Sequence, residues 1–360
     1  MIGQPSSIKN EMAFLGLKNF KSILKKILYF TAYYSGILHL LIYVQKKLRR
    51  QHCAAILFYH RLCDGSNNPH QLPHLDIREF SIQMCHIKKW YNVISMDEMA
   101  SRLDGGNRFT SPSIVITIDD GYQNNYSLAY PILKKFNMPA IIYLTTGFIG
   151  TNNALWVDDL ADILHSTKLK SFCFPELFGD KVLDISTRQS KMETLTKLYE
   201  EMVGLEQHKK ILMMQKLANV LGRNEVRRDN TERKMLTWNE VIEMSENKIS
   251  FGAHTVSHPT LSKMELREAK QEIHESKMEI ETRIGSKVRH FAIPNGRKED
   301  FNEELKRYCK EIGMSSVVST EPGSVSLQSD PYFLKRINPP SPMYIFACEI
   351  ARYMFLKKIE

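Results

Sequence analysis

The sequence predicts an α/β fold: a sheet or barrel of parallel strands with helices between them. Beyond Gln51, short apolar runs alternate with amphipathic stretches, which is typical of repeated βα units. The runs are almost continuously apolar, as expected of parallel strands that are covered on both faces. Polar residues follow several runs directly, and the carboxyl ends of parallel strands gather on one side of a sheet. We therefore expect a site on that side.

Composition sets the scale of the molecule. The chain has 360 residues, of which 43% are hydrophobic, so it can bury one large domain with appendages or two domains. Its six cysteines are scattered and form no C-x-x-C pair. Neither a zinc knuckle nor a dense disulfide framework is indicated.

Residues 1–51 are read as a basic, membrane-associating segment. They hold nine Lys or Arg against the single acid Glu11, which accounts for eight of the nine net positive charges of the chain. The basic character therefore belongs to this segment and does not indicate a nucleic-acid partner for the remainder.

Within this segment, "ILYFTAYYSGILHLLIYV" at 27–44 carries no formal charge and has Lys26 and Lys46 near its ends. Its length is close to the lower limit of about 17–25 residues for a membrane span. We expect residues 20–51 to form a helix on an anionic membrane surface, with the cytoplasmic face favoured. A single-pass anchor is one alternative, and an amphipathic helix packed on the protein's own core is another.

The remaining elements follow in order. Strands are predicted at 54–60, 113–118, 139–146, 248–253, 289–294 and 314–320, and helices at 123–137 and 264–285. Ser262 and Glu265 form a predicted capping box for the second helix, and Gly285 is its predicted end. A helical insertion interrupts the alternation at about 153–235. The predicted units are thus the segment 1–51, an α/β domain at 52–345 with this insertion, and an amphipathic tail at 346–360.

Two motifs carry the predicted chemistry. Asp119 and Asp120 follow the strand 113–118, where two adjacent carboxylates need a cation or hydrogen bonds. His254 and His258 follow the strand 248–253 with a spacing that suits two ligands on one turn. One aspartate with both histidines makes a metal site with open positions, and the other aspartate would remain as a general base for water.

These motifs resemble, in order, those of the polysaccharide deacetylases of the NodB homology family. The matching stretches cover about residues 54–340 without much of the insertion: "YHRL", "ITIDDGYQNN", "AIIYLTTGFIG", "LTWNEV", "FGAHTVSHPTL", "HFAIPNG" and "LKRINP". The resemblance implies a distorted (β/α) barrel and metal-dependent removal of acetyl groups from sugars. It implies that Asp119 is the base and that Asp120, His254 and His258 hold the metal, for which Zn²⁺ is expected.

The same resemblance places other residues around the substrate. Tyr122 of the aspartate motif, with Pro294 and Asn295 of "PNG", would line the groove, and a backbone amide there would help to hold the oxyanion. Trp156 and Trp238 are candidate sugar-stacking surfaces or packing residues. Arg336 either orients Asp119 or is an ordinary surface arginine.

The family's late Leu-x-His motif has no counterpart, because no histidine follows His290. His60, at the end of the first strand, is therefore the expected general acid; the alternative is that it only hydrogen-bonds backbone at the barrel mouth.

The expected function is a metal-dependent hydrolase that removes N-acetyl or O-acetyl groups from a polysaccharide or lipid-linked sugar in cell-envelope or exopolysaccharide synthesis. Two alternatives stay open. One is a deformylase or other amidase that acts on a lipid-linked sugar, and the other is a carbohydrate-binding barrel without catalysis.

Overall fold

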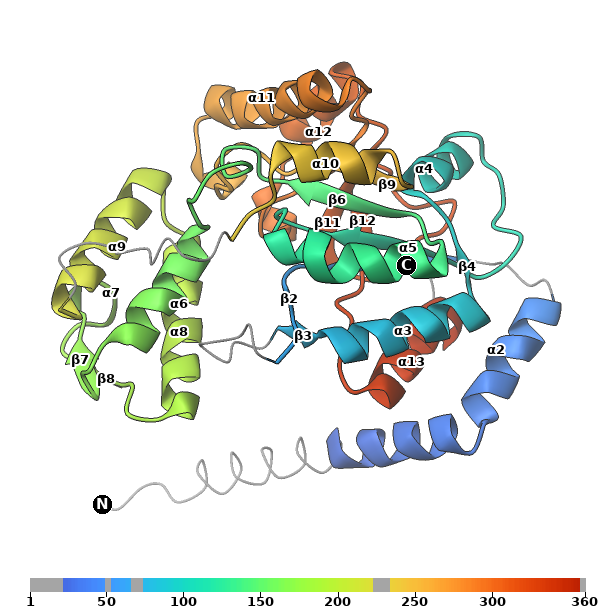
Figure 1. Ribbon diagram of the computed structural model, residues 1–360, viewed down its shortest axis with the longest axis horizontal. Coiled ribbons are helices and arrows are strands. Elements are labelled where there is room, and N and C mark those ends of the chain that lie inside the picture. The colour runs from blue at the N-terminus through green and yellow to red at the C-terminus, as the bar shows by residue number, and fades with distance from the viewer. Residues whose placement is uncertain (1–21, 49–52, 66–73, 223–233, 357–360) are drawn as a thin grey trace, which may run out of the picture.

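The computed structural model describes residues 22–48, 53–65, 74–222 and 234–356. Residues 1–21, with Arg49 and Arg50 of the basic segment and the last four residues of the predicted tail, lie outside this range. Within it, seven parallel strands follow one another around a nearly closed barrel (Figure 1). In spatial order they are β1 (Ala54–Tyr59), β5 (Ser113–Ile118), β6 (Ala140–Leu144), β9 (Ile249–Ala253), β10 (His290–Ala292), β11 (Ser316–Pro322) and β12 (Leu334–Arg336).

The barrel closes between its last strand and its first. Ile337, just after β12, pairs in parallel with Leu57 of β1, donating to the carbonyl of Ile56 at 2.8 Å and accepting from the amide of Phe58 at 3.2 Å. A short strand, β4 (Asn92–Val93), pairs with the start of β5. The sheet-or-barrel alternative is thus resolved as a barrel. The six predicted strands are confirmed, most of them with shorter ends, although β11 continues to Pro322.

Alternate strand residues separate two apolar layers. Ile56, Val115, Ile141 and Tyr143 belong to one buried cluster, while their strand neighbours belong to a second cluster shared with the helices. Because successive strand side chains point to opposite faces, the first set fills the barrel and the second lies beneath the helices. This explains why the sequence runs are continuously apolar.

Helices connect and cover the strands. The larger ones are α3 (Ile77–Trp90), α4 (Met96–Asp104), α5 (Tyr130–Phe136, after the π-helical turn Asn125–Ala129), α10 (Trp238–Ser245), α11 (Leu266–Ile284), α12 (Glu303–Glu311) and α13 (Met343–Ala351). Gly285 ends α11 with a φ of 69°, as predicted. The predicted capping box is wrong, because Ser262 lies in the 3₁₀ turn Leu261–Lys263 and the N-cap Glu265 has no side-chain capping bond.

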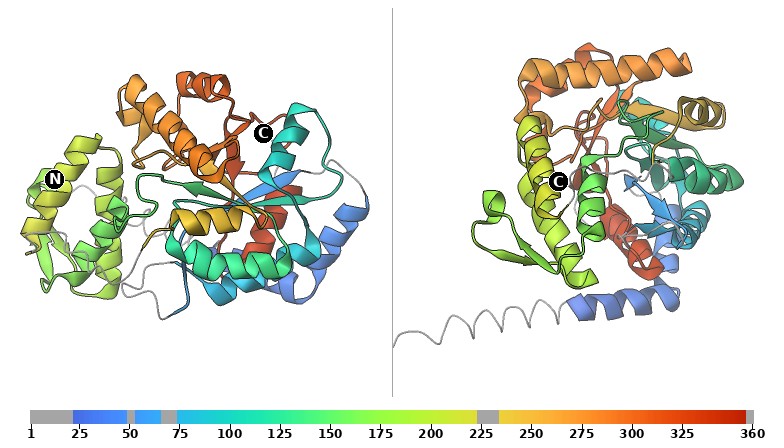
Figure 2. Two further views of the ribbon diagram at one scale, coloured as in Figure 1. Left: turned by 45° about the horizontal axis from the view of Figure 1, so that its top comes forward. Right: turned by 60° about the vertical axis from the view of Figure 1, so that its left-hand side comes forward.

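The insertion lies beside the carboxyl ends of the strands and has a core of its own (Figures 1 and 2). It contains α6 (Trp156–Ser166), α7 (Pro175–Phe178), α8 (Arg188–Val203) and α9 (Gln207–Val220). An antiparallel hairpin of β7 (Ser171–Cys173) and β8 (Val182–Asp184) lies among them, which the helical prediction lacked.

Both ends of the described chain pack on one side of the barrel. The helix Ser22–Tyr34 and α2 (Ile37–Lys47) lie along α3 and α13 (Figure 1). Residues 343–356 form α13 and a π-helical turn whose buried side chains join the main core. The predicted tail is therefore part of a helix that begins at Met343, ahead of the expected boundary.

Gly252 tests how tightly β9, the strand that the predicted histidines follow, is packed. A Cβ added there would lie 2.5 Å from two atoms of the Tyr143 ring and 2.9 Å from the His290 carbonyl oxygen. We expect Gly252→Ala to lower the free energy of unfolding by about 1–3 kcal/mol, as overpacking does. Urea denaturation measures this loss.

The matched control is Gly204→Ala, because that glycine has a φ of −80° and no atom within 4 Å of an added Cβ. Equal urea midpoints for the two variants would contradict the close contact between β9 and the barrel interior.

Candidate metal centre and adjoining carboxylate

The two aspartates come directly after β5, and their backbone directs them apart. Asp119 has ordinary strand-end geometry, with its amide donating to the Tyr59 carbonyl at 2.9 Å. Asp120 has a φ of 77°, in the left-handed region that a residue with a side chain seldom adopts. Such strain costs on the order of 1–3 kcal/mol and is concentrated at functional sites. Here it turns neighbouring carboxylates toward different partners.

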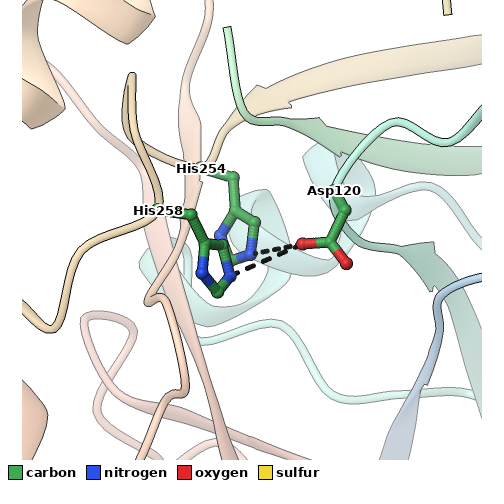
Figure 3. Close-up of side chains that lie close together, drawn as sticks. All are labelled: Asp120, His254 and His258. Atoms are coloured by element: carbon green, nitrogen blue, oxygen red, sulfur yellow. Dashed lines mark ion pairs between the residues drawn. The ribbon is translucent and has the colours of Figure 1, made fainter. Parts of the chain in front are cut away.

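Asp120 faces both histidines (Figure 3). Its Oδ1 lies 3.4 Å from the Nε2 atom of His254 and 3.5 Å from that of His258. His254 comes directly after β9, and His258 has a φ of 56° in the loop that follows. One ligand atom from each of the three residues lies within 4.8 Å of the others.

The surroundings of this trio fit a cation. Asp120 Oδ1 is a buried oxygen that accepts no hydrogen bond from the described residues. His254 Nδ1 lies 2.8 Å from the Ala292 carbonyl oxygen. Because a carbonyl oxygen can only accept a hydrogen bond, Nδ1 carries the proton of the neutral ring and Nε2 presents its lone pair toward Asp120. Burial raises the pKa of Asp120, but the adjoining imidazoles, His254 first among them, outweigh burial and hold that pKa low. An ionised carboxylate and two imidazole nitrogens are suitable ligands for a divalent metal.

Asp119, unlike Asp120, is paired with an arginine, Arg336. The guanidinium donates to Oδ1 at 2.8 Å and to Oδ2 at 2.7 Å. Arg336 is completely buried, which excludes the surface-arginine alternative. Burial raises the pKa of Asp119, but the positive charge of Arg336 outweighs it and keeps that pKa below the ordinary value. Asp119 is therefore ionised and paired with Arg336, and it is not one of the three candidate metal ligands.

His60 follows β1, the strand that lies between β12, which carries Arg336, and β5, which Asp119 follows. Its Nε2 is 3.9 Å from Asp119 Oδ2, and 46% of its side chain is exposed. The carbonyl of His60 accepts a hydrogen bond from the Asn125 side chain at 3.0 Å, which fixes the backbone but leaves the ring free to meet a ligand.

A cavity of about 970 Å³ brings these groups together. Its wall includes the expected site residues His60, Asp119, Asp120, Tyr122, His254, His258 and Asn295. Residues of α3 and of the segment before α13 extend the lining, and Tyr199 of the insertion also lines the cavity. The volume is in the range of sites that enclose a small organic ligand.

Two expected substrate residues lie elsewhere. Trp238 does not line this cavity, because Thr237 caps α10 and places the indole over Gly150 and beside the Arg283 guanidinium, 5.2 Å from its ring. Pro294 is buried, and its neighbour Asn295 reaches the cavity instead, with a φ of 61°. The predictions for Trp238 and Pro294 as wall residues are corrected accordingly.

Sequence reasoning missed a polar group beneath Tyr122. The Tyr122 hydroxyl donates to Asp158 Oδ2 at 3.1 Å, and Arg61 Nη1 lies 3.4 Å from Asp158 Oδ1. Burial raises the pKa of Asp158 to about 6, although Arg61 acts in the opposite direction. The acidic pair in "LWVDDL" was the only signal, and it gave no sign of its partner because Arg61 is far away in the sequence.

The Arg336 pair yields a stability prediction. Arg336→Met leaves Asp119 as a buried charge without its partner and is expected to cost about 3–5 kcal/mol of unfolding free energy. In Arg336→Met/Asp119→Leu the uncompensated charge is gone, so much of the loss should be recovered. Chemical denaturation in the presence of a chelator measures all three proteins; a double variant less stable than Arg336→Met would contradict the account.

Comparison with known proteins agrees with this architecture. Residues 106–317 match the family model for polysaccharide deacetylase. YxkH of Bacillus subtilis strain 168, a polysaccharide deacetylase by assignment, is 23% identical over 287 residues, which cover 78% of this chain and 70% of that protein. The poly-beta-1,6-N-acetyl-D-glucosamine N-deacetylase of Escherichia coli K12 is 31% identical over 94 residues, 26% of this chain and 11% of that longer protein.

The fold also resembles solved structures. The Streptococcus pyogenes deacetylase PplD, solved in complex with acetate, superposes with a TM-score of 0.55 at 18% identity, covering 85% of this chain and 99% of that one. The family model covers more than half of the chain and includes the strand ends that carry Asp119, Asp120, His254 and His258. The chain belongs to the polysaccharide deacetylase family.

Proposed function

We propose that this protein is a zinc-dependent hydrolase that removes N-acetyl or O-acetyl groups from a glycan, in the synthesis of a cell-envelope or exopolysaccharide. The observation that carries the proposal is the pairing of a His-His-Asp trio with a second, separately neutralised carboxylate in one cavity. A barrel that only bound carbohydrate would have no need of this arrangement.

Asp120, His254 and His258 are the residues that would hold the ion. Two imidazole nitrogens and one carboxylate oxygen leave coordination positions open, which is typical of catalytic zinc sites. A bound divalent ion supplies positive charge that polarises an acetyl carbonyl and makes water more acidic.

Asp119 is the proposed general base. Its charge is maintained by Arg336, whose two hydrogen bonds also fix the plane of the carboxylate. Each oxygen accepts one bond from the guanidinium and retains further acceptor capacity toward the cavity. Asp119 would accept the proton of the attacking water beside the metal trio.

His60 is the proposed general acid. Hydrolysis of an amide produces an amine that needs a proton as it departs, and imidazole is suited to proton transfer near neutral pH. The ring lies at the cavity wall, 3.9 Å from Asp119, so a proton accepted by the carboxylate is within short reach of the imidazole.

The insertion supplies a wall suited to a sugar. The ring of Tyr199 stacks on that of Trp156 with centroids 5.5 Å apart and an angle of 1° between them. The Tyr199 hydroxyl donates to Asn295 Oδ1 at 3.3 Å, which ties α8 to the loop after β10. A flat aromatic surface beside an amide complements the apolar face and hydroxyls of a pyranose ring. An acetylated amino sugar, as in the name of the Escherichia coli relative, is the substrate class that fits.

The metal trio predicts a division among the carboxylate and histidine variants. Asp120→Asn, His254→Ala and His258→Ala should each lower bound zinc and deacetylation together, because loss of one ligand weakens affinity by at least about 10-fold. Asp119→Asn should retain zinc and lose turnover. Isothermal titration with zinc, together with measurement of acetate released from N-acetylglucosamine oligomers, separates the ligand variants from the Asp119 variant. Full zinc occupancy in all three ligand variants would remove the trio from the proposal.

His60→Ala tests the general acid. We expect zinc binding to remain and hydrolysis of an N-acetyl substrate to fall by about 10²–10⁴-fold, the usual range for a positioned acid. The fall should be smaller for an activated ester whose leaving group needs no proton. Parallel kcat measurements on the two substrates provide the comparison. Equal losses on both, or no loss on either, would exclude His60 as the acid.

A further inference from the structure

The helix pair at residues 22–48 has two faces of opposite kind. Among the described residues, no single helix is long and apolar enough to cross a membrane. Ser22–Tyr34 and Ile37–Lys47 reach that length and composition only together, and a bend of 69° separates them. Gly36, with a φ of 81°, lies at the bend.

The inner face is fixed to the barrel domain. Lys25 Nζ lies 2.6 Å from Glu349 Oε1 of α13, and the Tyr29 hydroxyl donates to the same oxygen at 3.0 Å. In α2, Leu38 and Ile42 are buried in the main core, and His39 stacks on Trp90 of α3 at 4.8 Å. The expected alternative of a helix packed on the protein's own core thus describes one face of the pair.

The outer face is apolar and exposed. Twelve large hydrophobic side chains of residues 22–48 are exposed, against nine in the rest of the described chain. They are Ile23, Leu24, Ile27, Leu28, Phe30, Tyr34, Ile37, Leu40, Leu41, Tyr43, Val44 and Leu48. Single exposed hydrophobic residues are ordinary, but such a concentration marks a surface that is covered in use.

Charge identifies what covers it. Residues 22–48 contain no Asp or Glu, and Lys26 lies toward one end of the pair with Lys46 and Lys47 at the other. Lys25 is already paired with Glu349, whereas these three lysines are exposed. An apolar face bordered by lysines complements acyl chains beneath anionic headgroups. A second copy of this chain would bring the same positive charges together.

We propose that residues 22–48 form a bent dock that lies in the plane of an anionic lipid bilayer and is a rigid part of the catalytic domain. The apolar face enters the boundary between headgroups and acyl chains, and the lysines contact the headgroups. A span would require the 69° bend to straighten and Leu38, Ile42 and His39 to leave the core.

This dock also holds the cavity near the lipid. Asp76, Arg78 and Glu79, at the start of α3, form one edge of the cavity, and Ser341 lies just before α13 on the same edge. The same two helices carry the dock, and Tyr344 in the first turn of α13 contacts Phe30 of its exposed face at 5.6 Å. If the proposed deacetylase function holds, its substrate is a glycan presented at the membrane surface.

Vesicle binding by the full chain tests the dock. The probes are vesicles of phosphatidylcholine alone and of phosphatidylcholine with 30% phosphatidylglycerol, measured by co-sedimentation. We expect binding to the anionic vesicles, with a loss of at least about tenfold in Leu24→Gln/Leu28→Gln/Leu40→Gln/Leu41→Gln, because apolar burial supplies much of the affinity. Lys46→Glu/Lys47→Glu should weaken binding to the anionic vesicles and leave binding to phosphatidylcholine vesicles unchanged, and high salt should have the same effect.

Ile211→Gln/Leu212→Gln is the matched control, since it removes exposed apolar side chains from α9 and should bind like the unchanged protein. Undiminished binding by the four-leucine variant would overturn the proposal. Protection of the N-terminus from protease by sealed vesicles would indicate a span and would also overturn the proposal. A third contrary result is a protein that is dimeric without vesicles and becomes monomeric in the four-leucine variant. Hydrolysis of a soluble acetyl ester is measured in parallel; its absence in every variant would count against the deacetylase site and leave the vesicle result to decide the dock.

Discussion

The buried pair of Arg336 and Asp119 is the constraint on which the site depends. Besides Asp119, the guanidinium donates to the Ser319 carbonyl at 2.7 Å and to the Thr117 hydroxyl at 3.1 Å, and lies 4.6 Å from the Phe58 ring centroid. One side chain on β12 thereby contacts β11, β5 and β1, next to the place where the barrel closes. Burying such a charge is unfavourable unless every donor finds an acceptor, which is why the strand ends must meet in this geometry.

The pair also settles how two adjacent aspartates share one strand end. Arg336 neutralises Asp119, so Asp120 is available to the two histidines, and the left-handed backbone at Asp120 keeps the carboxylates apart. Gly121, with a φ of 85°, continues the turn against Leu144 and Ile149, where an added Cβ would lie 2.8 Å from each side chain. Local strain and one long-range ion pair together produce two carboxylates with different surroundings, as acid-base and metal chemistry require.

Much of this could be predicted from the sequence, because the strand runs and the residues after them are local signals. The barrel and the gathering of Asp119, Asp120, His254 and His258 follow those expectations. For Arg336 the sequence left two alternatives open, and the structure selects the partnership with Asp119. Trp238 and Pro294 were misplaced because side-chain direction depends on a helix cap and a loop turn. The link between Arg61 and Asp158 could not be predicted, since it joins the first strand to the insertion. The hairpin of the insertion is too short to show a clear period.

The central claim is that Asp120, His254 and His258 hold one metal ion while Asp119 stays with Arg336. Crystals of the zinc-loaded protein, measured on both sides of the zinc absorption edge, test this claim most directly. The account predicts one anomalous peak within about 2.0–2.2 Å of Asp120 oxygen and both histidine Nε2 atoms, with the Arg336 hydrogen bonds to Asp119 intact. A peak bonded to Asp119 in place of Asp120, or no peak among these three residues, would contradict it.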